Sequence, residues 1–242
     1  MASQLSKSKL KERSMILPNG RTAWYLERES DFQSNEKPLV IVPGLSVYMH
    51  LMGVQLSGFL KLIPNRRVII FELPYHGKRA TIDTDFSDPG CSLDGMTSSL
   101  EKFLDIIGLN GSFDLMGYSL GGSIATNFTI KHPDRVNRLV LLAPYYYSEA
   151  STEAYNTIFE AKQWSKLAAW RNIGEMEDWF HNWLGLDKKD SLPGFIMNGL
   201  ASLRSELYPE NHWDRFYQQL HGDSKSSLSF LEDNKSLLSV IS

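Results

Sequence analysis

The chain has 242 residues, of which 42% are hydrophobic and 22% charged, and its formal net charge is −3. This length suits one sizeable α/β domain with an inserted cap better than two separate domains, and the apolar content is too high for a disordered chain. The balanced charge gives no sign of nucleic-acid binding, and the single cysteine, Cys91, excludes a disulfide within the chain.

The N-terminal segment, residues 1–13, is predicted to be flexible. Its basic residues form a small cluster: Lys7, Lys9, Lys11 and Arg13. Glu12 interrupts the cluster, and a solvated terminus is the favoured interpretation. The first 15 residues lack the apolar segment of a signal peptide, and no apolar run is long enough for a transmembrane helix. We therefore expect a cytoplasmic protein, with peripheral membrane association left open.

Strand and helix patterns begin at residue 14, where we place the start of an α/β core that extends over residues 14–147. Runs 14–17 and 22–26 flank the tripeptide Pro18-Asn19-Gly20. An Asn-Gly pair between two strand-like runs is a strong signal for a β-hairpin, so the core is predicted to open with one.

Two buried strands follow the hairpin. The apolar run 38–42 ends at Pro43-Gly44, and the run 67–73 ends at the turn 74–77. Continuous Val, Ile and Leu in both runs is typical of strands that are buried on both faces of a sheet. Between them, apolar residues at helical spacing predict a helix over 49–63.

The same alternation continues in the second half of the core. Apolar spacing predicts a helix over 96–107, a strand over 113–116, a helix over 122–131 that stops at His132-Pro133, and a strand over 138–143. Strands that alternate with helices in this way predict a mostly parallel sheet with right-handed crossovers and helices on both faces.

The pattern changes after the last of these strands. Residues 148–227 contain no convincing strand and read as short helices, which predicts a helical cap inserted after the sixth strand. Five of the six tryptophans lie there: Trp164, Trp170, Trp179, Trp183 and Trp213. The cap could line an acyl pocket and present apolar surface to lipid, or pack on the sheet as core, and both can hold at once. Residues 228–242 are interpreted as the start of a C-terminal part of the core that is cut short.

The most informative motif is the segment 117–121, Gly-Tyr-Ser-Leu-Gly, between a strand and a helix. A serine hydroxyl becomes a nucleophile only when it is exposed, oriented and placed beside a base. A G-x-S-x-G turn between strand and helix exposes the serine in this way. The alternative is a serine in an ordinary glycine-rich turn.

Four motifs in order resemble the α/β-hydrolase superfamily. They are the Pro-Gly turn in 42–45, the segment 72–77, the elbow 117–122 and the helix-to-strand passage 132–141. Within the cap, three stretches resemble the monoacylglycerol lipase branch typified by abhydrolase domain-containing protein 6: residues 174–179, 193–200 and 211–217. The resemblance implies the α/β-hydrolase fold and, for this branch, a monoacylglycerol or similar lipid ester as substrate.

The resemblance also implies roles for individual residues. Ser119 would be the nucleophile that forms an acyl-enzyme, and the backbone N–H groups of Leu45 and Leu120 would form the oxyanion hole. No metal or cofactor is needed. Tyr145 opens a run of three tyrosines after a strand end, where α/β sheets place their ligand crevice. One of the three is expected to line the pocket, and Tyr145 and Tyr118 are our candidates for substrate contact.

The acid and base of the triad are the main departure from the family pattern. The expected order is Ser, then Asp or Glu, then His. Residues 233–241 resemble the helix that leads into the seventh strand, and neither Gly-x-x-Asp nor a later Gly-His follows. His76 is either a general base or a structural residue, and the resemblance favours the structural role. Glu149 is a candidate for a variant acid after the sixth strand.

Two functions of different classes remain open. The chain is either an incomplete copy of a serine hydrolase that acts on lipid esters, or a natural homologue without a triad that acts as a binding or scaffold protein. A C–C hydrolase or perhydrolase is a third, weaker interpretation. A sheet that ends at the sixth strand would expose the apolar edge 139–142, so poor solubility or a dimer through this edge is predicted. Membrane contact would be made through the cap.

Overall fold

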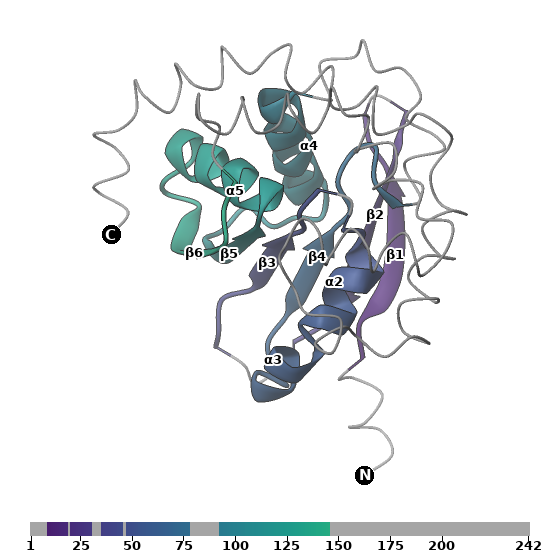
Figure 1. Ribbon diagram of the computed structural model, residues 1–242, viewed down its shortest axis with the longest axis vertical. Coiled ribbons are helices and arrows are strands. Elements are labelled where there is room, and N and C mark those ends of the chain that lie inside the picture. Colours follow the sequence, from purple (N-terminus) through teal and green to yellow (C-terminus); the bar gives the residue numbers. More distant parts are fainter. Residues whose placement is uncertain (1–8, 19, 31–34, 46, 78–91, 146–242) are drawn as a thin grey trace, which may run out of the picture.

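The computed structural model describes residues 9–18, 20–30, 35–45, 47–77 and 92–145. These residues form a six-stranded sheet in the order β1-β2-β4-β3-β5-β6, with helices on both faces (Figure 1). The elements are β1 (Lys11–Ile16), β2 (Thr22–Arg28), β3 (Leu39–Val42), α2 (Met49–Gln55), α3 (Ser57–Leu62), β4 (Val68–Phe71), α4 (Leu93–Ile106), β5 (Phe113–Tyr118), α5 (Leu120–Lys131) and β6 (Val136–Leu142).

The predicted hairpin is confirmed: β1 and β2 pair antiparallel, with Ile16 opposite Thr22. Gly20 has a φ of 77°, which a glycine adopts without strain, and its N–H donates to the carbonyl of Leu17 at 2.9 Å. β1 begins at Lys11, three residues before the core boundary expected at residue 14. The cap expected over 148–227 and the segment 228–242 lie outside the described residues.

The predicted parallel part of the sheet is also confirmed. β3 pairs in parallel with β4 on one side and with β5 on the other, and β5 pairs in parallel with β6. Alternate residues of each strand point to opposite faces. One face packs with α4 and α5 into a cluster that includes Val42, Phe71 and Leu115, and the other packs with α2 and α3. Both faces of the central strands are therefore buried.

The helix predicted over 49–63 is in fact two short helices, α2 and α3, which meet at Leu56. Gly53 and Gly58 lie on either side of the break, and glycine weakens a helix by about 1 kcal/mol relative to alanine. Gly53 is also in close contact with the sheet, because a Cβ there would lie 3.3 Å from Leu26 Cδ1. Among the described elements no helix has the length and apolar character needed to cross a membrane.

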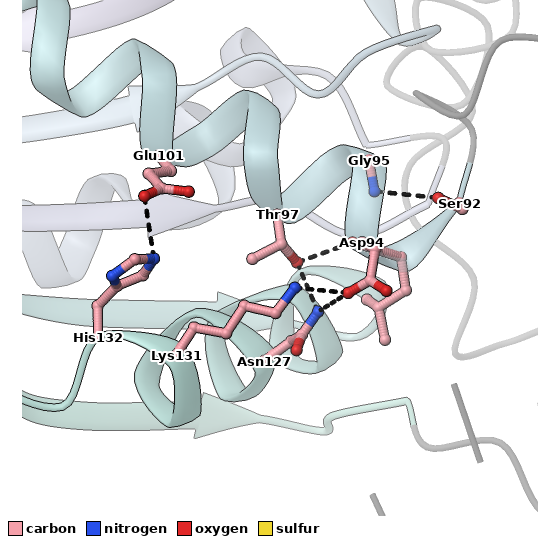
Figure 2. A network of polar contacts seen from close by, with 9 residues as sticks. Ser92, Asp94, Gly95, Thr97, Glu101, Asn127, Lys131 and His132 are labelled. Atoms are coloured by element: carbon pink, nitrogen blue, oxygen red, sulfur yellow. Dashed lines mark hydrogen bonds and ion pairs between the residues drawn. The ribbon is translucent and has the colours of Figure 1, made fainter. Parts of the chain in front are cut away.

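Polar contacts join α5 to α4, as Figure 2 shows. The Asp94 carboxylate accepts hydrogen bonds from Lys131 (2.7 Å) and from Asn127 (3.0 Å), and Asn127 also donates to the Thr97 hydroxyl at 3.0 Å. The hydrogen bond from Lys131 is the main cause that lowers the pKa of Asp94. These contacts fix the helix that begins immediately after Ser119.

Candidate active site

The carboxyl ends of β3, β4, β5 and β6 lie at one edge of the sheet because these four strands are parallel. The segments that leave this edge contain most of the residues singled out in the sequence: 43–45 after β3, 72–77 after β4, Ser119 after β5 and 143–145 after β6. Parallel sheets bind their ligands outside the carboxyl ends of the strands. This edge is therefore the candidate active site.

Ser119 adopts a backbone conformation that side chains rarely take, with φ 51° and ψ −119°. Its N–H donates to the carbonyl of Leu142 (3.0 Å), and its own carbonyl accepts from the N–H groups of Gly122 (2.8 Å) and Tyr145 (2.9 Å). A residue in a strained conformation persists only where its surroundings fix it. The strand ends one residue before Ser119 and α5 begins one residue after it, so Ser119 occupies a sharp strand-to-helix turn.

The two glycines of the motif are required by close backbone packing. A Cβ built on Gly117 would lie 2.7 Å from the Cα of Gly122, and one built on Gly121 would lie 2.7 Å from the carbonyl carbon of Val42. The Cβ on Gly121 would also overlap the carbonyl oxygens of Val42 and Pro43. Only glycine at both positions lets the first turn of α5 approach β5 and the end of β3.

The loop after β3 passes directly beside the serine. A Cβ built on Gly44 would lie 3.0 Å from the Cβ of Ser119, and the N–H of Val47 donates back to the Gly44 carbonyl at 3.1 Å. Leu45 follows Gly44 in this turn and is half-buried against the core. Leu120 is the first residue of α5, where backbone N–H groups have no partner within the helix. The two candidate oxyanion donors thus lie on the two segments that flank Ser119.

Glu72 and His76 lie after β4 and are completely buried. A carboxylate oxygen of Glu72 accepts a hydrogen bond from the N–H of Met49, the first residue of α2, at 3.1 Å. It therefore holds the far end of the loop that starts at Gly44. Nδ1 of His76 lies 2.8 Å from the carbonyl oxygen of Pro74, a contact that stabilises its own turn. This contact fits the structural role expected for His76.

The two tyrosines proposed to contact substrate lie against different faces of the sheet. Tyr118 packs with the cluster under α2 and α3, and Tyr145 packs with the cluster under α4 and α5. Both are half-buried and both adjoin Ser119, Tyr118 through the chain and Tyr145 through its N–H. Leu120 is only 3% exposed and belongs to the core.

No side chain in the described part of the chain hydrogen-bonds to the hydroxyl of Ser119. His50 contacts Glu12 at 3.0 Å, and His132, at the end of α5, contacts Glu101 at 3.2 Å. Each of these histidines thus has a carboxylate partner of its own. Glu149, the candidate for a variant acid, lies outside the described residues, as do His181, His212 and His221.

The turn after β6 is the part of the site that the sequence does not predict. Ala143 has a φ of 42°, and Leu142 before it and Tyr145 two residues after it hydrogen-bond to Ser119. A glycine at this position would have suggested a left-handed turn, but an alanine gives no such signal. The sequence does show that residues 143–145 follow a predicted parallel strand, and this position alone marks them as part of the candidate site.

Comparison with known proteins adds independent evidence. A protein-family model described as alpha/beta hydrolase fold matches residues 37–238. The (lyso)-N-acylphosphatidylethanolamine lipase of Homo sapiens is 31% identical over 142 residues, which are 59% of this chain and 40% of that protein. The abhydrolase domain-containing protein abhd-5.2 of Caenorhabditis elegans is 29% identical over 156 residues, 61% of this chain and 34% of that protein. The matched region therefore spans less than half the length of these two relatives.

A solved structure agrees with the fold. The crystal structure of a putative lipase (lip1) from Acinetobacter baumannii AYE superimposes with a TM-score of 0.64 at 18% sequence identity, covering 95% of this chain and 69% of that one. At this identity the likeness supports the chain fold alone.

Proposed function

This chain belongs to the alpha/beta hydrolase fold family, and on that premise we propose that it is a serine hydrolase of carboxylic esters with Ser119 as nucleophile. The observation that carries the proposal is the conformation of Ser119, with φ 51° in a strand-to-helix turn directly beside the Gly44 loop. Strain of this kind is concentrated at functional sites. An ordinary glycine-rich turn has no need of a strained serine.

In the proposed mechanism, the Ser119 oxygen attacks the ester carbonyl carbon while its proton passes to a general base. Negative charge then develops on the former carbonyl oxygen, and the backbone N–H groups of Leu45 and Leu120 stabilise it. One such donor contributes about 3–4 kcal/mol to the transition state. Collapse of the tetrahedral intermediate releases the alcohol and leaves an acyl-enzyme, which water hydrolyses. The candidates that the sequence offers for the other triad groups are His76 as base, for which the resemblance favours a structural role, and Glu149 as a variant acid.

The substrate class we propose is a lipid ester with one acyl chain, such as a monoacylglycerol. The resemblance of the cap to monoacylglycerol lipases supports this class, as does the name of the human relative, a (lyso)-N-acylphosphatidylethanolamine lipase. The residues that adjoin Ser119 are mainly apolar or aromatic, with Leu45, Tyr118 and Tyr145 partly buried. In this proposal the two tyrosines contact the substrate on opposite sides of the serine.

A second candidate function is a binding or scaffold protein that retains the elbow without catalysis. The observation in its favour is that β6 carries exposed apolar side chains. In this alternative, β6 is a natural docking edge, because Val140 and Leu142 are 37% and 36% exposed. A dimer through this edge, or contact with a membrane through the cap, would then be the functional state.

Hydrolysis by the full chain separates the two functions. Monoolein and a lyso-N-acylphosphatidylethanolamine are offered in micelles to the wild-type protein and to Ser119→Ala, and fatty acid release is measured. The proposal predicts release by the wild type and none by the variant. If the wild type and Ser119→Ala melt at the same temperature and both release fatty acid only at the background rate, the non-catalytic alternative would be favoured. The ratio of the two substrates decides between a glycerol and a glycerophosphate head group.

A further inference from the structure

The turn that leaves β6 holds the backbone of Ser119 at two points. The carbonyl of Leu142 accepts the N–H of Ser119 at 3.0 Å, and the N–H of Tyr145 donates to the carbonyl of Ser119 at 2.9 Å. Two of the three hydrogen bonds that fix the strained serine therefore come from this turn, and the third comes from Gly122. The conformation of Ser119 therefore depends on the turn after β6 as well as on the G-x-S-x-G motif itself.

The turn carries strain of its own. Ala143 lies between the two anchoring residues with a φ of 42°, a left-handed conformation that alanine rarely adopts. Its side chain is exposed, so no packing of the methyl group explains the conformation. The next residue, Pro144, packs against the first turn of α5, because a Cβ built on Gly122 would lie 2.7 Å from the Cβ of Pro144. The strained Ser119 is thus hydrogen-bonded to two residues, Leu142 and Tyr145, that flank the strained Ala143 in the chain.

We propose that residues 142–145 are a positioning clasp that sets the direction of the oxyanion donor on Leu120. The peptide group between Ser119 and Leu120 is planar and trans, so its N–H points opposite to its carbonyl. The N–H groups of Tyr145 and Gly122 fix that carbonyl. They therefore fix the Leu120 N–H as well, without touching it. Leu142 and Tyr145 are positioning residues, and the catalytic meaning of the clasp rests on the proposed function of Ser119.

A pair of variants at Tyr145 isolates the hydrogen bond. Tyr145→Pro removes the backbone N–H that donates to Ser119, because proline has none. Tyr145→Ala keeps this N–H and, like the proline variant, lacks the aromatic ring. Any effect of losing the ring on substrate binding is therefore common to both, and the difference between the two variants reports the clasp.

The first measurement is hydrogen exchange of the backbone amides of Ser119 and Gly122 in the folded full-length chain. The clasp predicts exchange about tenfold faster in Tyr145→Pro than in Tyr145→Ala, the order expected for loss of one buried hydrogen bond. Amides of α4, residues 93–106, should exchange equally in both variants, which shows that the fold is intact. Equal exchange at Ser119 and Gly122 in two folded variants would overturn the clasp.

The second measurement is steady-state ester hydrolysis. A positioning role predicts that kcat of Tyr145→Pro falls about tenfold below that of Tyr145→Ala while KM stays the same, because an oxyanion donor acts on the transition state. A change in KM with equal kcat would contradict a role in orienting Leu120. If the wild-type chain hydrolyses no ester, the proposed function fails, and hydrogen exchange still decides whether the clasp holds Ser119.

Discussion

Replacement of Gly121 by alanine tests whether the elbow and the β3 loop need their close packing. The new Cβ would lie 2.7 Å from the carbonyl carbon of Val42, whereas ordinary contact begins at 3.4 Å. It would also overlap the carbonyl oxygens of Val42 and Pro43. Both sides of this contact are main chain, so no side chain can rotate to make room. The end of β3 and the start of α5 must separate by at least about 0.7 Å.

Two consequences of this separation can be measured. The free energy of unfolding should fall by about 1–3 kcal/mol, as for other overpacked interiors. For a chain of this size, this lowers the melting temperature by roughly 2–4 °C for each kcal/mol. The displacement also moves the Leu45 loop away from Ser119. Since a misplacement of about 1 Å can cost a factor of about 100 in rate, we expect hydrolysis to fall far more than the fraction of folded protein.

Gly111→Ala is the matched control, because a Cβ there meets nothing within 4 Å and the backbone is not left-handed. Melting is followed by circular dichroism, and ester hydrolysis is measured on both variants at a temperature where both are folded. The reasoning about close packing is refuted if Gly121→Ala melts at the same temperature as Gly111→Ala and keeps the wild-type rate.

Three further predictions concern groups around the elbow. Ala143→Gly should keep activity and raise the melting temperature, because it relieves left-handed strain of about 1–2 kcal/mol. Ala143→Val should lower both the activity and the melting temperature. Equal melting temperatures of the two variants would contradict the inferred strain at this position. Asp94 has a pKa below its usual 3.8, chiefly because of Lys131, so its contribution to stability is present above that pH and disappears as pH falls through the lower folded value. Chemical denaturation at a series of acidic pH values should therefore show that the free energy of unfolding of the wild type falls as the pH is lowered. The fall should be less than about 1 kcal/mol for such an exposed pair, and Asp94→Asn should not show it. Glu72→Ala leaves the buried N–H of Met49 without this acceptor and should cost about 1–3 kcal/mol in urea unfolding, with Glu72→Gln costing less; equal losses would argue against the hydrogen bond.

The strands of the sheet could be predicted because each is marked by the apolar composition of a short, continuous segment. The runs 38–42 and 113–116 are apolar at every position or nearly so, which distinguishes strands buried on both faces from half-exposed ones. Both are strands in the structure, as β3 and β5. Apolar spacing continues through Leu56 and so predicts one helix over 49–63. The break at Leu56 lies between Gly53 and Gly58, which weaken a helix and which apolar spacing does not take into account.

The candidate nucleophile could also be predicted, since G-x-S-x-G is contiguous in sequence. The hydrogen bonds that hold Ser119 in place could not be predicted, because their partners lie more than twenty residues away, at Leu142 and Tyr145. Their contribution comes from backbone groups, which every residue has, so no side-chain pattern reveals it. For the same reason Glu72 was recognised as part of a motif, whereas its bond to Met49 became apparent only in the folded chain.

The central claim, that Ser119 is positioned as a nucleophile, is tested most directly by covalent labelling. The full 242-residue chain is treated with a fluorophosphonate probe, and adducts are located by mass spectrometry, with Ser119→Ala as control. We expect Ser119 to be labelled faster than every other serine of the chain, because a serine beside an oxyanion hole retains reactivity even with a weak base. A folded chain in which Ser119 is labelled no faster than the other serines would contradict it.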